Sequence, residues 1–458
     1  MNRKDIIHIG VRAHPDGGPA HAAKDPARHW YLSISETARR EMRLPYHKRL
    51  RVRLSPHGSP VILPVVPTWR TAVHAEDTLL PVRVSKNKQG IVLGPIIGIL
   101  TVKRPGATTF RGNRANFRDI AKMGKRLGLT VAVFTPEGLA KGGDSVLGYI
   151  HAGPRKGATG TKWRQVVLPL PSVVYNRVPD RESEARADVV RAKKWLAERG
   201  IPLFNNGFFN KADLYRWLQD DQETAPYLPR TAPLESHDQL RRWVRQHELL
   251  YVKPVDGKAG DGIIQVRREG ERFRVTYQNN GKRSHTTHKN RQDAADAVWS
   301  RTRGRDYLLQ QGIYLTSHAG RHFDLRLLLQ KNRYGNWQVT GMGARIADAD
   351  GITTHVPNGG QIEKADKLLR ASFGRQKGDE VGNKVKQTAL RLAETIERAA
   401  TRDGGLIGEM SMDIGLASDG KLWFFEANAK PMKFDEPYIR AKSLMRLLHY
   451  CEFLTRSN

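Results

Sequence analysis

Two acidic residues near the end of the chain have the spacing that places side chains opposite each other in a β-hairpin. Residues 408–431 form two strand-like runs on either side of Asp419–Gly420, a dipeptide favoured in two-residue type I′ turns. A two-residue turn there puts Asp413 directly opposite Glu426, and side-chain alternation places both on one face. The other face is apolar and predicts contact with a core through Met410, Met412, Ile414, Trp423 and Phe425.

Opposed carboxylates of this kind are candidates for a metal site. Directly opposite residues of an antiparallel pair have Cβ atoms about 5 Å apart, and like charges there destabilise the pair. Alternation adds the amide oxygen of Asn428 to the face that carries Asp413 and Glu426. Oxygen ligands suit Mg²⁺, with Mn²⁺ as an alternative. A one-residue shift or a bulge would instead separate the two acids and leave them in solvent.

A lysine followed by closely spaced glycines forms a second candidate site. An apolar strand ends at Lys253, and Gly257, Gly260 and Gly262 then form a loop whose backbone can approach an anion closely. The loop is no Walker motif, because no Gly-Lys-Ser/Thr follows. It is no dinucleotide fingerprint either, because the next residues predict a strand rather than a helix. We expect either a mobile glycine flap over phosphate groups or a glycine-rich β-turn.

An acidic and a basic residue alternate on a third segment, the predicted strand 321–329. A period of two places Asp324 and Arg326 on one face, and the apolar side chains of Phe323, Leu325 and Leu327 on the other. The pair could bind a charged group, or it could form a structural ion pair. Both interpretations stay open.

The elements that must position these residues divide the chain into regions that differ in their predicted pattern of strands and helices. Residues 1–93 hold short β-type runs without a catalytic grouping, which is typical of a docking module or of a structural addition. Strands and helices alternate from 94 to 206 as in an open α/β sheet, and residues 207–458 mix helices with hairpins. Apolar spacing and terminal signals predict helices at 113–127, 183–199, 236–247 and 383–401.

Composition excludes several classes of protein. Hydrophobic residues make up 39% of the 458 residues, which is enough for several cores and argues against wholesale disorder. The single cysteine, Cys451, excludes an internal disulfide framework and a thiolate metal cluster. No apolar stretch approaches the roughly 18 residues of a spanning helix, and the 16 histidines show no H-E-x-x-H spacing. We expect a multidomain cytoplasmic protein without a membrane span.

The charge is strongly positive, with 77 lysines and arginines against 46 acidic residues and a formal net charge of +31. Such a chain suits anionic partners: nucleic acid, an acidic surface, or an acidic or phosphorylated substrate. The cations are dispersed, however, and the densest runs lie at 48–53 and 301–305. A generally basic surface and a dedicated polyanion site are therefore both open.

Taken together, these segments resemble the ATP-grasp enzymes, and more closely the YheC/YheD-type family of endospore coat-associated ATP-grasp proteins. Four motifs occur in the order expected for that family, at 203–211, 226–231, 252–257 and 425–431. The resemblance covers about residues 94–455 and implies a multidomain fold with α/β and α+β parts. The implied units are a small β-rich N-terminal module (1–93), an α/β pre-ATP-grasp domain (94–206), a small ATP-grasp subdomain with the glycine flap (207–312) and a C-terminal subdomain with the Mg²⁺ site (313–458).

The resemblance also implies a nucleotide site. Lys211 and Lys253 are similar to the two lysines that bind nucleotide phosphates, with Gly257, Gly260 and Gly262 in the flap. The segment 308–314 resembles the hinge that binds adenine, and the hinge residues are Gln310, Gln311 and Ile313. Many members carry an acidic residue in this hinge, where this chain has two glutamines.

The remaining implied roles concern catalysis and the metal. Asp413, Glu426 and Asn428 match the positions that hold Mg²⁺ beside ATP. Arg326, in the strand that resembles the Asp-x-Arg strand of peptide-ligating members, and Arg345 would act with Lys253 on the phosphate being transferred. A solvated surface cation remains the alternative for each lysine taken alone.

The function that the resemblance implies is an ATP- and Mg²⁺-dependent ligase that joins a carboxylate to an amine or another nucleophile through an acyl phosphate. The carboxylate substrate could be an anionic peptide or polymer, and the family name suggests association with a spore coat. A non-catalytic scaffold or nucleotide sensor in a coat-like assembly is the alternative. A basic nucleic-acid-binding protein is the third possibility, and it predicts salt-dependent affinity that survives loss of Glu426.

Overall fold

The protein is described from a computed structural model, which covers residues 6–12, 29–45, 47–56, 59–68, 77–87, 90–107, 109–139, 143–152, 163–255, 261–279, 282–302, 304–349, 351–354, 359–402, 405–432 and 437–456. The described strands form four sheets that follow one another along the chain. Two of the predicted flap residues, Gly257 and Gly260, lie outside the described residues.

Alternating apolar residues in the first strands produce a sheet that closes on itself, in the order β1-β2-β4-β3-β6-β5. Its interior is filled by inward-facing side chains such as Ile9, Leu32, Leu63 and Val82. This confirms the β-rich N-terminal region that the sequence predicts. The elements are β1 (Ile6–Val11), β2 (Trp30–Ile34), α2 (Glu36–Glu41), β3 (Arg49–Arg53), β4 (Pro60–Pro67), β5 (Thr78–Asn87) and β6 (Gly90–Gly94).

The second sheet has the order β10-β9-β8-β7-β11-β12. Strands β8, β7, β11 and β12 run parallel, while β9 is antiparallel to both of its neighbours. Helix α4 begins where Asn113 accepts a hydrogen bond from the backbone of Asn116, and it ends at the left-handed Gly128. The helix predicted at 183–199 is broken at Arg186, where ψ is 135°. The elements are β7 (Ile96–Leu100), α4 (Arg114–Leu127), β8 (Thr130–Leu139), β9 (Ser145–His151), β10 (Trp163–Pro169), β11 (Val173–Asn176), α5 (Arg181–Ala185), α6 (Ala187–Glu198) and β12 (Leu203–Phe204).

The third sheet, in the order β13-β18-β14-β15-β16-β17, is covered by helices on one face. Leu240 of α8 and Val298 of α9 pack there against alternate strand residues such as Val252, Val266 and Val275. The elements are α7 (Lys211–Gln219), the 3₁₀ turn η2 (Ala225–Tyr227), β13 (Thr231–Pro233), α8 (His237–Gln246), β14 (Leu249–Pro254), β15 (Ile264–Glu269), β16 (Arg272–Asn279), β17 (Lys282–His288), α9 (Arg291–Thr302) and β18 (Tyr307–Gln311).

The fourth sheet, β22-β21-β20-β23-β24 with β19 beside β20, is covered by the long helix α11. That helix starts earlier than the predicted helix 383–401, at Arg375, and ends one residue before it, at Ala400. The elements are β19 (Ser317–His318), β20 (Arg321–Lys331), β21 (Trp337–Ile346), β22 (Gln361–Lys364), α10 (Ala365–Phe373), α11 (Arg375–Ala400), β23 (Glu409–Leu416), β24 (Leu422–Asn428) and α12 (Pro437–Arg456).

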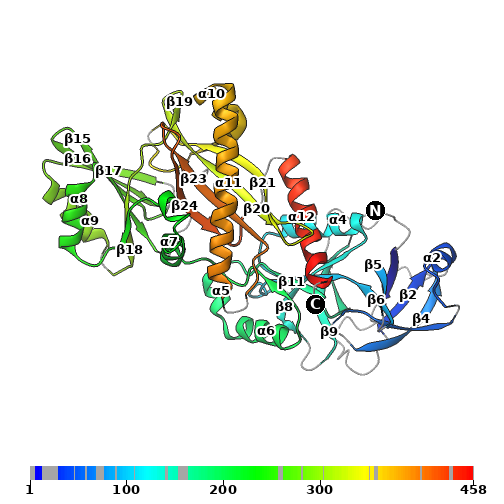
Figure 1. The fold of residues 1–458 in the computed structure, drawn as a ribbon. Helices are drawn as coiled ribbons and strands as arrows, with labels where there is room; N and C mark the ends of the chain where they lie inside the picture. The colour runs from blue at the N-terminus through cyan, green and yellow to red at the C-terminus, as the bar shows by residue number, and fades with distance from the viewer. Residues whose placement is uncertain are drawn as a thin grey trace, which may run out of the picture.

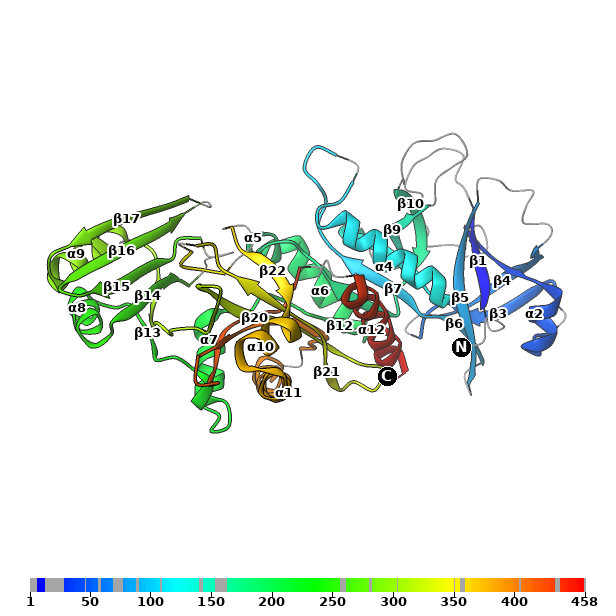
Figure 2. The same cartoon turned by 90° about the horizontal axis from the view of Figure 1, so that it is seen from above.

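The molecule is elongated, with the closed sheet at one end and the third sheet at the other (Figures 1 and 2). Helix α12 connects the middle parts, because it packs against α4 of the second sheet and against β20 of the fourth. None of the described helices has the length and apolarity that a membrane crossing needs.

Candidate active site between the third and fourth sheets

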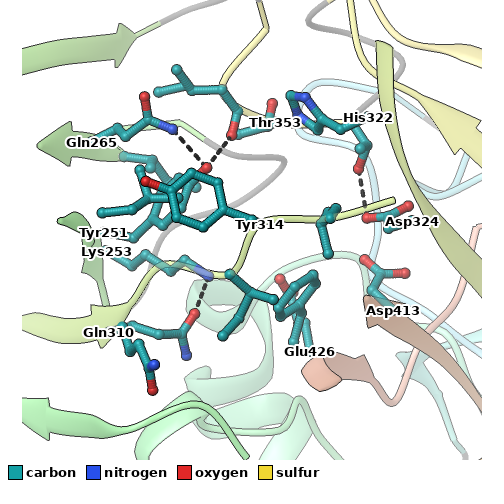
Figure 3. Close-up of a pocket in the computed structure, with 18 of the residues that line it drawn as sticks. Tyr251, Lys253, Gln265, Gln310, Tyr314, His322, Asp324, Thr353, Asp413 and Glu426 are labelled. Carbon is teal, nitrogen blue, oxygen red and sulfur yellow. Dashed lines mark hydrogen bonds between the residues drawn. The ribbon is translucent and has the colours of Figure 1, made fainter. Parts of the chain in front are cut away.

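A cavity of about 320 Å³ lies between the uncovered face of the third sheet and the fourth sheet. Figure 3 shows Lys253 and Gln310 approaching from one side, and Asp324 and Asp413 from the other. Eight of the predicted site residues line it: Lys211, Lys253, Gln310, Gln311, Ile313, Arg345, Asp413 and Glu426. The other three that the structure describes, Gly262, Arg326 and Asn428, are not among the lining residues.

The predicted pair Asp413 and Glu426 does lie opposite each other, in the antiparallel pairing of β23 with β24. The turn that produces this register differs from the prediction. Three residues, 418–420, form the loop, since the backbone N–H of Ala417 donates to the carbonyl of Lys421 at 2.9 Å. Gly420 adopts a left-handed φ of +83°, which is typical of a three-residue hairpin loop.

A bulge in β24 compensates for the longer loop. Ile414 pairs with Phe424 while Asp413 pairs with Glu426, so Phe425 is an extra residue without a partner. The prediction that Trp423 and Phe425 face the core is therefore wrong. Leu422 and Phe424 occupy the core, Trp423 is half-buried, and Phe425 lines the cavity.

The bulge is held from outside the hairpin by a chain of side-chain hydrogen bonds. Tyr215 of α7 donates from its hydroxyl to the carbonyl of Phe425 at 3.1 Å. Gln310 donates to the same hydroxyl through its amide nitrogen and accepts a hydrogen bond from Lys253 through its amide oxygen. The side chains of Gln310 and Tyr215 thus connect the predicted nucleotide lysine to the carboxylate hairpin. This explains why a neutral amide, able to donate and accept, suits position 310.

Asp413 is also bound by two arginines from neighbouring strands. Arg326 of β20 donates to its carboxylate at 2.9 Å, and Arg345 of β21 contacts the other oxygen at 2.9 Å. Arg345 also binds Asp324 in a bidentate pair, with distances of 2.9 and 2.7 Å. The ion pair proposed for Asp324 with Arg326 is replaced by pairs across strands. Although burial alone would lower the pKa of Arg345, the two carboxylates raise it above its usual value.

The oxygen atoms that Asp413, Glu426 and Asn428 carry are of the type that binds magnesium. Glu426 is half-buried and lines the cavity, and Asn428 lies two residues further along, opposite Ser411. All of these ligands offer oxygen, which Mg²⁺ prefers. Asp413 already shares its carboxylate oxygens with two guanidinium groups. Among the described residues, no group of three or more His, Cys, Asp or Glu side chains has an arrangement that could hold a metal ion by itself.

Lys253 is the cation at the centre of the opposite wall. Its ammonium group lies 5.5 Å from the ring of Tyr251 and 5.6 Å from the ring of Phe425. Burial, followed by repulsion from Lys211, lowers the pKa of Lys253 from 10.5 to about 8. A bound polyanion would favour the charged form of Lys253, because an opposite charge nearby stabilises the ammonium group.

Local structure explains how the other predicted nucleotide residues reach this wall. Lys211 is the first residue of α7, whose N-cap Asn210 accepts from the backbone of Ala212 at 2.8 Å. Gly262 has a φ of +75°, where a side chain would be strained. Gly312 follows Gln311, and a Cβ there would lie 2.2 Å from the side chain of Leu249.

Several lining residues were missed by sequence reasoning. Tyr251 donates a hydrogen bond to the carbonyl of Ile352 at 3.1 Å and accepts one from Gln265 at 2.7 Å, so it links the two sheets. Thr354 donates to Asp324. Alternation along β14 places Tyr251 on the same face as Lys253 and could have identified it. The contact with Ile352 has no local signal.

The chain is similar to several known proteins. Among solved structures, D-alanyl-alanine synthetase A from Vibrio cholerae is 14% identical, with a TM-score of 0.42, over 79% of this chain and 97% of that one. The ATP-grasp ligase PsnB in complex with a minimal precursor is 15% identical, with a TM-score of 0.41, over 80% of this chain and 99% of that one.

Similarity to curated proteins is higher. The endospore coat-associated protein YheD of Bacillus subtilis is 29% identical over 378 residues, which cover 79% of each chain. YheC of the same organism, also named endospore coat-associated, is 22% identical over 68% of this chain and 84% of its own length. The family model of YheC/D-like ATP-grasp proteins matches residues 200–454. This range is more than half of the chain and contains all residues that line the cavity. The protein therefore belongs to the YheC/D-like ATP-grasp family, as the motifs of its sequence predict.

Proposed function

We propose that the protein is an ATP- and Mg²⁺-dependent ligase that activates a carboxylate as an acyl phosphate and transfers the acyl group to an amine or similar nucleophile. One observation carries the proposal. Two lysines, Lys211 and Lys253, and two acidic residues, Asp413 and Glu426, line one cavity between two sheets. This is the division of charge that a metal-bound triphosphate requires.

The residues of the chain would contribute mainly by position and charge. Lys211 and Lys253 would bind phosphate oxygens, while the hinge at Gln311 and Ile313 would border the base. Magnesium held by Asp413, Glu426 and Asn428 would neutralise further phosphate oxygens. This chemistry requires no nucleophilic side chain.

The reaction would have two steps. An oxygen of the substrate carboxylate attacks the γ-phosphorus of ATP, and the bond to the β-phosphate oxygen breaks, which releases ADP. The nucleophile then attacks the acyl carbon, the bond from that carbon to the phosphate oxygen breaks, and inorganic phosphate and one proton leave. Arg345 lines the cavity and would stabilise the transferring phosphoryl group. Arg326 contacts the cavity only through Asp413, so we assign it the role of positioning that carboxylate.

The test is ADP release with MgATP and a panel of carboxylates, including a host-cell extract, with ligated products identified by mass spectrometry. We expect carboxylate-dependent ADP release that Glu426→Gln abolishes. The control is Glu394→Gln, the same change at an exposed position of α11, which should leave the rate unchanged. Carboxylate-dependent release that persists in Glu426→Gln would contradict the proposed metal ligand.

A non-catalytic scaffold or nucleotide sensor is the second candidate function. It is favoured by the two arginines that neutralise Asp413, because the charge of this residue is compensated by the chain itself. The coat-associated names of the relatives point in the same direction and suggest spore-coat association for this chain. ATP binding without turnover for any acceptor would support this function over the ligase.

A further inference from the structure

The third sheet has a second polar surface beyond the nucleotide cavity. Helices α8 and α9 cover one face of β15, β16 and β17. On the opposite face Arg267, Arg272 and Arg274 are exposed, while Thr276 and Gln278 are buried. Strand alternation and the observed registers assign the residues of this opposite face. We call it the basic face, and its charged or ionisable residues are Arg267, Glu269, Arg272, Arg274, Arg283 and His285.

The basic face contains four arginines and a single glutamate. Arg267 lies directly opposite Arg274 across the two strands, an arrangement that is unfavourable for like charges. Arg274 pairs with Glu269 at 3.1 Å, and Arg283 pairs with Asp348, two residues after the end of β21, at 2.6 Å. Within the described parts of the chain, Arg267 and Arg272 make no ion pair. The basic face therefore carries a net positive charge.

The basic face is continuous with the cavity. Gln265 and Arg267 line the cavity, and their neighbours across the strands belong to the basic face. Figure 3 shows Gln265 beside Tyr251 at the same wall as Lys253. Arg267 lies close enough to Tyr251 and His322 to influence the pKa of both side chains. A chain that lies along Arg274 and Arg267 would therefore reach the lining of the cavity.

We propose that the basic face binds a carboxylate-rich peptide, which presents the carboxylate that the site activates. The proposal rests on the proposed function and adds the class of substrate. The positive charge of the basic face fits acidic side chains. The geometry of the basic face fits an extended peptide, because residues two apart on a strand are separated by about 6.6 Å, and alternate side chains of an extended peptide have the same spacing. The described strands β15–β17 place no Phe, Tyr or Trp on this face, so it lacks the stacking surface that single-stranded nucleic acid uses.

The test measures binding of a fluorescent oligoglutamate peptide to the full chain by anisotropy at low ionic strength. We expect Arg272→Glu/Arg274→Glu to weaken peptide binding about tenfold or more, because two attractive charges become repulsive. The matched control is Arg268→Glu/Lys282→Glu, with the same change of charge at two exposed positions of the opposite face. The control should change the affinity by less than about twofold.

The variants separate this proposal from the ligase proposal. Arg272 and Arg274 lie outside the cavity lining, so binding of a fluorescent ATP analogue should be unchanged and shows that the variant is folded. Equal loss of peptide binding in both double variants, or no loss in either, would overturn the basic face as the site. A single-stranded oligonucleotide serves as a competing ligand in the same assay. If it binds the native protein more tightly than the peptide does, and if the test variant loses that binding, the ligand of the basic face is nucleic acid and the peptide proposal is overturned. Peptide binding without ADP release would refute the ligase and keep the binding face.

Discussion

The two walls of the cavity balance their charges in different ways. On the fourth-sheet wall, Asp324, Arg345, Asp413 and Arg326 alternate in sign and form a continuous series of ion pairs. On the third-sheet wall, Lys253 has a neutral amide as its hydrogen-bond partner. Asp324 and Asp413 on the first wall are thus paired before any ligand arrives. On the second wall the ammonium group of Lys253 has no acidic hydrogen-bond partner among the described residues. We therefore expect the first wall to keep its geometry without a ligand and the second wall to attract a polyanion.

The largest expected effect breaks the compensated wall. Arg345→Met leaves Asp324 and Asp413 buried without their shared partner, and we expect the free energy of unfolding to fall by about 3–5 kcal/mol. Chemical denaturation measures it. The control is Arg370→Met, which breaks a similar bidentate pair with Asp379 on an exposed surface and should have little effect. Equal losses in the two variants would refute the distinction between buried and exposed pairs.

The matching change on the other wall should affect binding rather than folding. Lys253→Met removes a buried charge whose partner is neutral, so we expect stability to be maintained. ATP affinity should fall about a hundredfold, because a charge-assisted contact to phosphate is lost. Calorimetric titration with ATP measures this. Lys421→Met, at an exposed lysine over the ring of Trp423, serves as the control and should bind normally. Retention of full affinity by Lys253→Met would remove this lysine from the nucleotide site.

A smaller effect is expected at Phe425, the extra residue of the bulge, which lines the cavity. A Cβ on Gly415 would lie 2.4 Å from the ring of Phe425, so Gly415→Ala should push that ring into the cavity. We expect a loss of about 1–3 kcal/mol in stability and weaker ATP binding. Gly207→Ala is the control, since no atom lies within 4 Å of the added Cβ. Unchanged binding in Gly415→Ala would show that Phe425 does not border the nucleotide.

The smallest expected effect is a pH dependence of ATP binding. Because the pKa of Lys253 is lowered to about 8, the charged form predominates below that pH and is lost as the pH rises through it. ATP affinity should therefore be highest below about pH 8 and decrease above it. Lys253→Arg should flatten the profile, since arginine stays charged. A profile in Lys253→Arg as steep as that of the native protein would assign the pH effect to another group.

The sequence predicted side-chain direction correctly where a strand is regular. Alternation placed Asp324 and Arg326 on one face of β20, because a period of two is a local property of a strand. The same rule assigned Trp423 and Phe425 to the wrong face of β24, where a bulge interrupts the period. The turn and bulge were missed, and the register survived because their two one-residue shifts cancel. The ion pairs of Asp413 could not be predicted, since they depend on β20 lying between β21 and β23. Strand order is a non-local property without a motif in this segment.

The proposed ligase mechanism depends most directly on a divalent cation at Glu426. The decisive measurement is calorimetric titration of ATP with and without Mg²⁺, in the native protein and in Glu426→Gln. We predict that Mg²⁺ strengthens ATP binding to the native protein and that Glu426→Gln loses this enhancement while keeping its magnesium-free affinity, which Lys211 and Lys253 provide. If Mg²⁺ strengthens ATP binding equally in both proteins, or if neither protein binds ATP, the proposed metal site at Glu426 is contradicted.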